Sequence, residues 1–102
     1  LSINGAKSDA LNNATVEVGK RGIHVVIPAG NFRQDACETS PSSAPNGITV
    51  GATVTDTDSI TDFSNFGKCI NIFAPGTDIT AAGNTSATDL LIESGTSQAS
   101  PH

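Results

Sequence analysis

Hydrophobic positions in the first part of the chain change from helical to strand-like spacing. Ala10, Ala14, Val18 and Gly22 recur at helical spacing, which predicts one amphipathic helix over residues 9–21 that starts near Asp9 and stops at a glycine. Residues 23–27 are mostly β-branched and predict a strand buried on both faces. Preceded by an extended apolar start at residues 1–5, this order reads as strand, helix, strand, the pattern of an α/β fold.

The pattern then changes to a long polar stretch followed by further strands. Residues 28–46 contain glycine, asparagine, aspartate, serine and three prolines, which predicts a long loop, and loops of that length commonly carry function. Residues 47–53 and 68–74 are expected to be strands, with a polar turn region over residues 55–62 between them. After residue 79 the pattern weakens, with one short apolar segment at residues 90–92. Residues 95–102 resemble the start of a helix, so we expect this chain to be a piece of a longer polypeptide.

Composition and charge exclude several classes of protein. The chain has 102 residues, which corresponds to one small domain, with 5 Lys plus Arg against 10 Asp plus Glu and a net charge of -5. Its only aromatic residues are four phenylalanines. Neither a basic patch nor an aromatic stacking surface can be assembled, which excludes nucleic acid and an anionic membrane surface as main partners. No stretch approaches the roughly 18 consecutive apolar residues of a membrane-spanning helix.

Two cysteines and two short glycosylation patterns indicate an oxidising compartment. Cys37 and Cys69 are the only cysteines, and no Cys-x-x-Cys pair or Cys/His cluster supports a zinc site. They could form one disulfide, worth roughly 3–4 kcal/mol on the loop-entropy model, or remain two buried free thiols. Asn13 and Asn84 each begin an Asn-x-Ser/Thr pattern, the acceptor for N-glycosylation.

Two local motifs contain groups that could carry acyl-transfer chemistry. Ser97 follows a glycine turn and precedes the predicted helix, so its hydroxyl could be exposed and its N–H could favour a developing negative charge. The simpler interpretation of that tripeptide alone is a helix-capping serine. Asn31 follows a buried strand, where its side chain could donate to a substrate oxyanion. Taken alone, it is equally explained as a turn asparagine.

Six motifs, in this order, resemble the second half of a subtilisin-like serine protease of the proteinase K-like branch. They are Leu-Ser-Ile-Asn-Gly at 1–5, Pro-Ala-Gly-Asn at 28–31, Ser-Pro at 40–41 through Val-Gly-Ala at 50–52, Phe-Ser-Asn-Phe-Gly at 63–67, Phe-Ala-Pro-Gly at 73–76 and Gly-Thr-Ser-Gln-Ala-Ser-Pro-His at 95–102. The resemblance implies an α/β subtilisin-like fold, a parallel sheet flanked by helices. Residues 1–102 would then be the C-terminal portion of a peptidase S8/subtilisin-like catalytic domain, truncated at both ends.

The same resemblance implies a serine endopeptidase that works through an acyl-enzyme. Ser97 matches the family's nucleophile and Asn31 its side-chain oxyanion donor, with the Ser97 N–H as the second donor. Cys37 and Cys69 match a disulfide found in several proteinase K-like members. The implied substrate-binding residues are the segment that pairs with an extended peptide and the wall of the pocket beside the cleaved bond: Leu1, Ser2, Ile3, Asn4 and Gly5, and Pro28, Ala29 and Gly30.

The chain departs from the family pattern at several positions. The family's catalytic aspartate and histidine lie in upstream motifs absent from these residues, and neither His24 nor His102 matches the general base. Without a base a serine hydroxyl is a weak nucleophile, so the isolated chain is expected to be inactive. Asn4 replaces a usual glycine, which would narrow the cleft. In the other two departures, this chain has Pro28 where the family usually has alanine, and Gln98 where it usually has methionine or a similar apolar residue.

The resemblance also makes expectations about cofactors and partners. No cofactor is required for the chemistry, but a structural calcium site would use the carbonyls of Pro45 and Gly47 with Asn71, where an amide is a poorer ligand than the usual carboxylate. Expected partners are a peptide or protein substrate, the missing N-terminal half and a pro-segment inhibitor, in a secreted or vacuolar protein. Two alternatives are a non-catalytic subtilase-fold relative that binds peptides and a disulfide-linked structural domain in which Ser97 only caps a helix.

Overall fold

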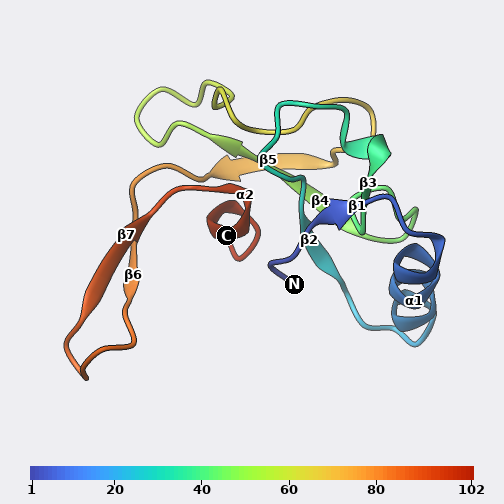
Figure 1. Ribbon diagram of the computed structural model, residues 1–102, viewed down its shortest axis with the longest axis horizontal. Helices are drawn as coiled ribbons and strands as arrows, with labels where there is room; N and C mark the ends of the chain where they lie inside the picture. The colour runs from blue at the N-terminus through green and yellow to red at the C-terminus, as the bar shows by residue number, and fades with distance from the viewer.

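A three-stranded parallel sheet lies at the centre of the computed structural model, which describes residues 1–102. The sheet order is β2 (Val26–Pro28), β4 (Ile48–Thr53) and β5 (Ile72–Pro75). The short helix α2 (Thr96–Ala99) packs on this sheet, where Ala99 joins the buried Val50 and Ala52 of β4. Figure 1 shows α2 beside the sheet, near the centre of the view, and α1 at the right-hand end of the molecule. The predicted α/β class with a parallel sheet is therefore confirmed.

Helix α1 (Asp9–Lys20) matches the predicted helix over residues 9–21 within one residue. Its start is capped by Ser8, whose hydroxyl accepts from the Leu11 N–H at 3.3 Å, and Asp9 is the first helical residue. The helix stops before Gly22, whose φ of 81° lies in the left-handed region that glycine adopts most easily. The hydrophobic spacing thus located the helix, and Ser8 is its capping residue.

Strands β2 and β5 are shorter than predicted and start later. The predicted strand at residues 23–27 is reduced to Val26–Pro28, and Ile23 is 58% exposed. Strand pairing sets this boundary, because β2 can only pair where β4 begins, at Ile48. The predicted strand at residues 68–74 begins at Ile72, since the preceding residues form a turn in which the Ile70 N–H donates to Gly67.

The expected strand, helix, strand unit does not form within one sheet. β1 (Gly5–Ala6) pairs antiparallel with β3 (Thr39–Ser40) in a separate two-stranded sheet, with Gly5 opposite Ser40. The predicted loop at residues 28–46 therefore contains β3 and the short 3-10 helix η1 (Ala36–Glu38). This pairing holds the N-terminal segment against the loop that follows β2.

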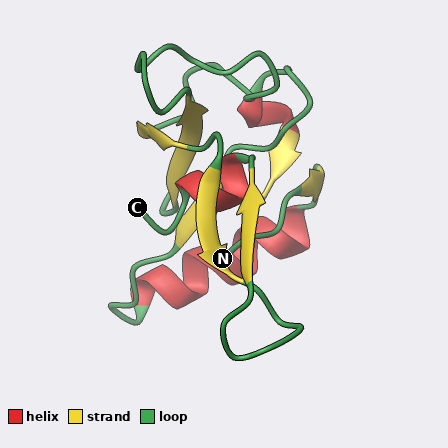
Figure 2. Cartoon of the chain, turned by 90° about the vertical axis from the view of Figure 1, so that its left-hand side faces the viewer, coloured by secondary structure: helices red, strands yellow, loops and turns green.

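A hairpin projects from the rest of the molecule, where the sequence pattern weakened. β6 (Ile79–Ala82) pairs antiparallel with β7 (Leu90–Glu93), with Ile79 opposite Glu93. Figure 1 shows the hairpin extending away from the sheet, and Figure 2 shows its two strands side by side in front. No helix in the chain combines the length and the apolar character needed to cross a bilayer.

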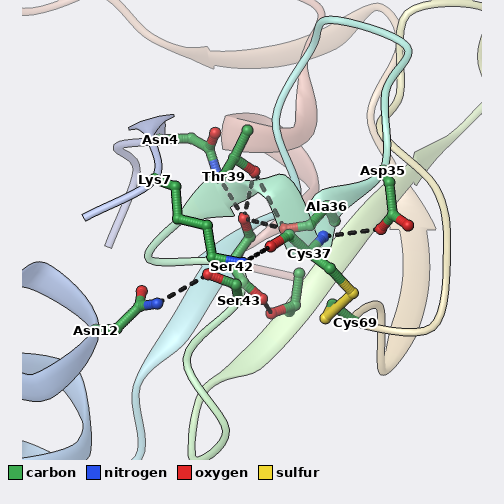
Figure 3. Close-up of a disulfide and its surroundings, with 11 residues drawn as sticks. Asn4, Lys7, Asn12, Asp35, Ala36, Cys37, Thr39, Ser42, Ser43 and Cys69 are labelled. Carbon is green, nitrogen blue, oxygen red and sulfur yellow. Dashed lines mark hydrogen bonds between the residues drawn. A yellow bond between two sulfur atoms is a disulfide. The ribbon is translucent and has the colours of Figure 1, made fainter. Parts of the chain in front are cut away.

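Cys37 and Cys69 form a disulfide (Figure 3). Their Cα atoms are 5.3 Å apart, and the bond joins η1 to the turn before β5 across a sequence separation of 32. The chain has no free cysteine. The alternative of two free thiols is therefore wrong, and the bond ties the long loop after β2 to the third strand of the sheet.

Candidate active site

Ser97 and Asn31 come together where helix α2 meets the end of strand β2. The Asn31 Oδ1 atom accepts two hydrogen bonds from Thr96, one from its N–H at 2.9 Å and one from its hydroxyl at 2.7 Å. Both contacts join residues that are 65 positions apart in the sequence. They fix the orientation of the Asn31 carboxamide, so that its NH₂ group faces away from Thr96.

Two N–H donors face one space beside Gly95. A Cβ atom on Gly95 would lie 3.2 Å from Asn31 Nδ2 and 3.7 Å from the Ser97 N atom. Neither donor has an acceptor within the chain. The Gln98 Oε1 atom lies nearer still, at 2.9 Å from the same point, so a side chain at position 95 would crowd the space beside both donors. Two preorganised, unpaired donors beside a serine can stabilise the oxyanion of a tetrahedral intermediate.

Thr96 links the two parts of this site, although the sequence analysis gave it no role. Its hydroxyl donates to Asn31 and accepts from the Gly30 N–H at 3.1 Å. The side chain is 1% exposed, so both contacts are shielded from water. Thr96 stands in the Gly-Thr-Ser motif, and that motif was the only sequence signal that could have pointed to it.

Asn65 supports the turn that carries Asn31, and its role was also missed. It is fully buried. Its Nδ2 atom donates to the Ala29 carbonyl at 2.8 Å, and its Oδ1 atom accepts from the N–H groups of Phe32 at 3.0 Å and Gln34 at 3.1 Å. These bonds replace the secondary-structure partners that the turn lacks. Asn65 lies in the Phe-Ser-Asn-Phe-Gly motif at residues 63–67.

A cavity of about 320 Å³ opens beside Ser97. It brings together most of the residues predicted to bind substrate, and its lining consists of Ser2, Ile3, Asn4, Pro28, Gly30, Asn31, Phe32, Thr96 and Ser97. Leu1 and Gly5 lie outside this lining. Ala29 is fully buried behind the wall, where its N–H donates to the Val50 carbonyl and extends the pairing of β2 with β4.

No general base stands next to Ser97 in this chain. The Ser97 hydroxyl makes no hydrogen bond to a histidine, and the Nδ1 atom of His102 lies 3.0 Å from the Gln98 carbonyl oxygen. His24 is exposed and precedes β2 instead of lying within the strand. The chain also contains no group of three histidine, cysteine or acidic residues that could hold a metal ion.

The residues matched to a calcium site do not fit that ion. Pro45, Gly47 and Asn71 do line one cavity of about 170 Å³. However, the Asn71 Oδ1 atom accepts a hydrogen bond from the Thr49 N–H at 2.7 Å, and Lys68 lines the same cavity. Calcium favours carboxylate oxygens, and this cavity has none. We therefore assign no role to calcium at this position.

The two glycosylation patterns lie in different local structures. Asn13 is exposed on helix α1, but the Thr15 hydroxyl of its pattern is buried and donates to the Leu11 carbonyl at 3.0 Å. Asn84 lies in the exposed loop between β6 and β7, as does Ser86 of its pattern. Only Asn84 therefore presents the complete pattern at the surface.

The sequence and the fold both match known proteins over the whole chain. The chain is 53% identical over 104 residues to the subtilisin-like serine protease Rho m 2.0101 of Rhodotorula mucilaginosa, a match that covers 100% of this chain and 30% of that protein. It is also 53% identical over 107 residues to cerevisin of Saccharomyces cerevisiae, a match that covers 100% of this chain and 16% of cerevisin. Among solved structures, a cold adapted subtilisin-like serine proteinase superimposes with a TM-score of 0.91 at 40% identity, covering 100% of this chain and 36% of that chain.

A comparison with protein families also finds a match over almost the entire sequence. The chain spans about a third or less of the length of each of these matched proteins. The model of the subtilase family, Peptidase_S8, matches residues 2–102. The observed parallel sheet, the Asn31–Thr96 contact and the glycine-bordered serine are in accord with that match. This chain belongs to the subtilase family of serine peptidases.

Proposed function

We propose that the full-length protein carrying this chain is a serine endopeptidase that hydrolyses peptide bonds through an acyl-enzyme. The observation that supports this best is the pair of unpaired donors, Asn31 Nδ2 and the Ser97 N–H, whose nitrogen atoms lie 3.2 Å and 3.7 Å from one point beside Gly95. A structural or helix-capping serine would not need a second donor from a residue 66 positions away in the chain. Residues 1–102 would supply the nucleophile and the oxyanion donors.

The reaction would proceed in two acyl-transfer steps. The Ser97 Oγ atom attacks the carbonyl carbon of the scissile peptide while a histidine from the upstream part of the domain takes the hydroxyl proton. The two donors hold the oxyanion of the tetrahedral intermediate. The histidine then passes its proton to the leaving amine, and water hydrolyses the acyl-enzyme. The exposed residues Ser2 and Ile3 would pair with the substrate backbone as an added strand.

The proposal extends to partners and location. The upstream half of the catalytic domain must pack with this chain to supply the aspartate and histidine, and a pro-segment inhibitor would occupy the cleft before activation. The chemistry requires no metal or organic cofactor. A relative from a Thermus strain is named an extracellular serine proteinase, and the disulfide between Cys37 and Cys69 suits an oxidising compartment. We therefore expect a secreted or vacuolar protein.

A fluorophosphonate probe tests this function directly. The probe reacts only with a serine that a base has activated, and mass mapping identifies the modified peptide. We expect label on Ser97 of the full-length protein, lost in Ser97→Ala. Ser100→Ala is the matched control, since Ser100 is a neighbouring serine whose buried hydroxyl donates to the Thr96 carbonyl at 3.0 Å, and it should retain the label.

The opposite result would identify a different function. If the wild-type protein takes no label while an active subtilisin-like control does, the endopeptidase proposal is wrong. The non-catalytic, peptide-binding alternative would then account for the cavity beside Ser97, and binding of unmodified peptides to the Ser97→Ala protein would support it.

A further inference from the structure

The side chain of Asn4 lines the cavity beside Ser97. The Asn4 Nδ2 atom donates to the Pro28 carbonyl at 3.1 Å and to the Ser42 hydroxyl at 3.0 Å, and a third acceptor, the Ala29 carbonyl, lies at 3.4 Å. Figure 3 shows the amide directed at the hydroxyl cluster of Thr39 and Ser42. The carboxamide therefore bridges the N-terminal segment and the opposite wall of the cavity.

Asn4 also lines a second cavity. This cavity is lined by Asn4 together with Lys7, Glu38 and Thr39, among others. Asn4 and Phe32 are the two residues that line both cavities. Removing the carboxamide would thus enlarge the space beside Ser97.

The Asn4 carboxamide is held tightly in this position. Its Oδ1 atom is buried and has no hydrogen-bond partner. The same atom lies 2.9 Å from the place that a Cβ on Gly30 would occupy, so it packs directly against the Gly30 backbone. A buried acceptor without a partner is normally unfavourable, and here the three contacts of the NH₂ group keep the amide in place despite that cost.

We propose that Asn4 restricts the substrate residue before the cleaved bond to a small side chain. This inference rests on the proposed endopeptidase function. A carbonyl group placed at Ser97, with its oxygen facing Asn31 Nδ2, directs the adjoining side chain into this cavity. The Asn4 amide is hydrogen-bonded from the N-terminal segment to the opposite wall, so an aromatic side chain must displace it and break the bonds to Pro28 and Ser42. An alanine or serine side chain fits without that displacement.

The test compares two tetrapeptide anilides that differ only in having alanine or phenylalanine before the anilide. Rates are measured on the full-length protein and normalised to active sites titrated with a fluorophosphonate. We expect the wild type to prefer alanine and Asn4→Ala to raise the phenylalanine-to-alanine ratio of kcat/KM by about tenfold or more. Asn12→Ala is the matched control: Asn12 also donates to a serine hydroxyl, has a buried unpaired Oδ1 atom and lines neither cavity.

Several outcomes would overturn the inference. A wild type that prefers phenylalanine, or a folded Asn4→Ala protein with an unchanged ratio, rules out Asn4 as the determinant, even though the endopeptidase function stands. A wild type that takes no label and cleaves neither anilide refutes the proposed function, and this inference with it. Should Asn4→Ala fail to fold, Asn4→Ser retains a hydroxyl for Ser42; an intermediate ratio supports the inference and an unchanged ratio overturns it.

Discussion

Replacing Thr96 with valine tests whether its hydroxyl orients the oxyanion donor. Valine keeps the shape of the side chain but removes the 2.7 Å bond to Asn31 Oδ1 and the acceptor for the Gly30 N–H. The Asn31 oxygen would keep only the bond from the Thr96 N–H. Its carboxamide would then be less well fixed, although every catalytic atom remains present.

The structure sets the size of the expected effects. Deleting an oxyanion donor outright costs about 2.7–4 kcal/mol in the transition state, which is an upper limit because Thr96→Val leaves the Asn31 amide in place. We expect Thr96→Val to lose half of that energy, which corresponds to a kcat about 10- to 30-fold lower. KM should change little, since the interaction acts mainly in the transition state. The buried Gly30 N–H loses its partner, which should lower the free energy of unfolding by about 1–3 kcal/mol.

Steady-state kinetics and denaturant unfolding of the full-length protein would measure both effects. Thr49→Val is the matched control, because Thr49 is also 1% exposed and its hydroxyl donates to the Ser42 carbonyl at 2.9 Å, away from the donors. It should lose stability without losing kcat. A Thr96→Val protein with the wild-type kcat, or a Thr49→Val protein with an equal loss of kcat, would refute the positioning role.

Three further predictions concern stability and modification. Replacing Cys37 and Cys69 together by alanine should lower the free energy of unfolding by about 4 kcal/mol for a loop closed across 32 residues; an unchanged denaturation midpoint would contradict the loop-entropy reasoning. Asn71→Asp should add the missing carboxylate and give a higher Tm in calcium than in EDTA, whereas the Tm of the wild type should be the same in both. A wild-type Tm that rises with calcium would contradict the conclusion that these residues do not fit the ion. In a secreting eukaryotic host, Asn84→Gln should remove one glycan by intact mass and Asn13→Gln none, and the reverse result would exclude surface presentation as the deciding factor.

Local patterns predicted the elements whose boundaries depend on local interactions. The helix at Asp9–Lys20 and the strand at Ile48–Thr53 were located within one residue because side-chain periodicity and glycine stops act over a few positions. The starts of β2 and β5 were placed too early, since pairing with β4 decides where those strands begin. β3 was missed, and the first strand was expected at residues 1–5 and in the main sheet, because two-residue strands carry no pattern and pair across more than 30 positions.

The candidate site shows the same division between motifs and long-range contacts. Ser97 and Asn31 were identified from family motifs, and the structure places them around one space. The sequence did not predict that Thr96 and Asn65 hold Asn31 and its turn in place, because a buried hydrogen bond between distant residues leaves no periodic trace. The hydrogen bonds of Asn4 to Pro28 and Ser42 were likewise not predicted, although a side chain at a position usually occupied by glycine drew attention to this residue.

The hydrogen bonds between Asn31 and Thr96 also affect when the site can form during synthesis. Asn31 and Thr96 are 65 residues apart, so a ribosome that adds about 5–20 residues per second needs roughly 3–13 seconds after making Asn31 to supply its partner. Until then the Asn31 carboxamide lacks the partner that orients it in the folded structure. Ser97, with its hydroxyl and its N–H, is made directly after Thr96, so the candidate site is completed only at the end of the synthesis of these residues.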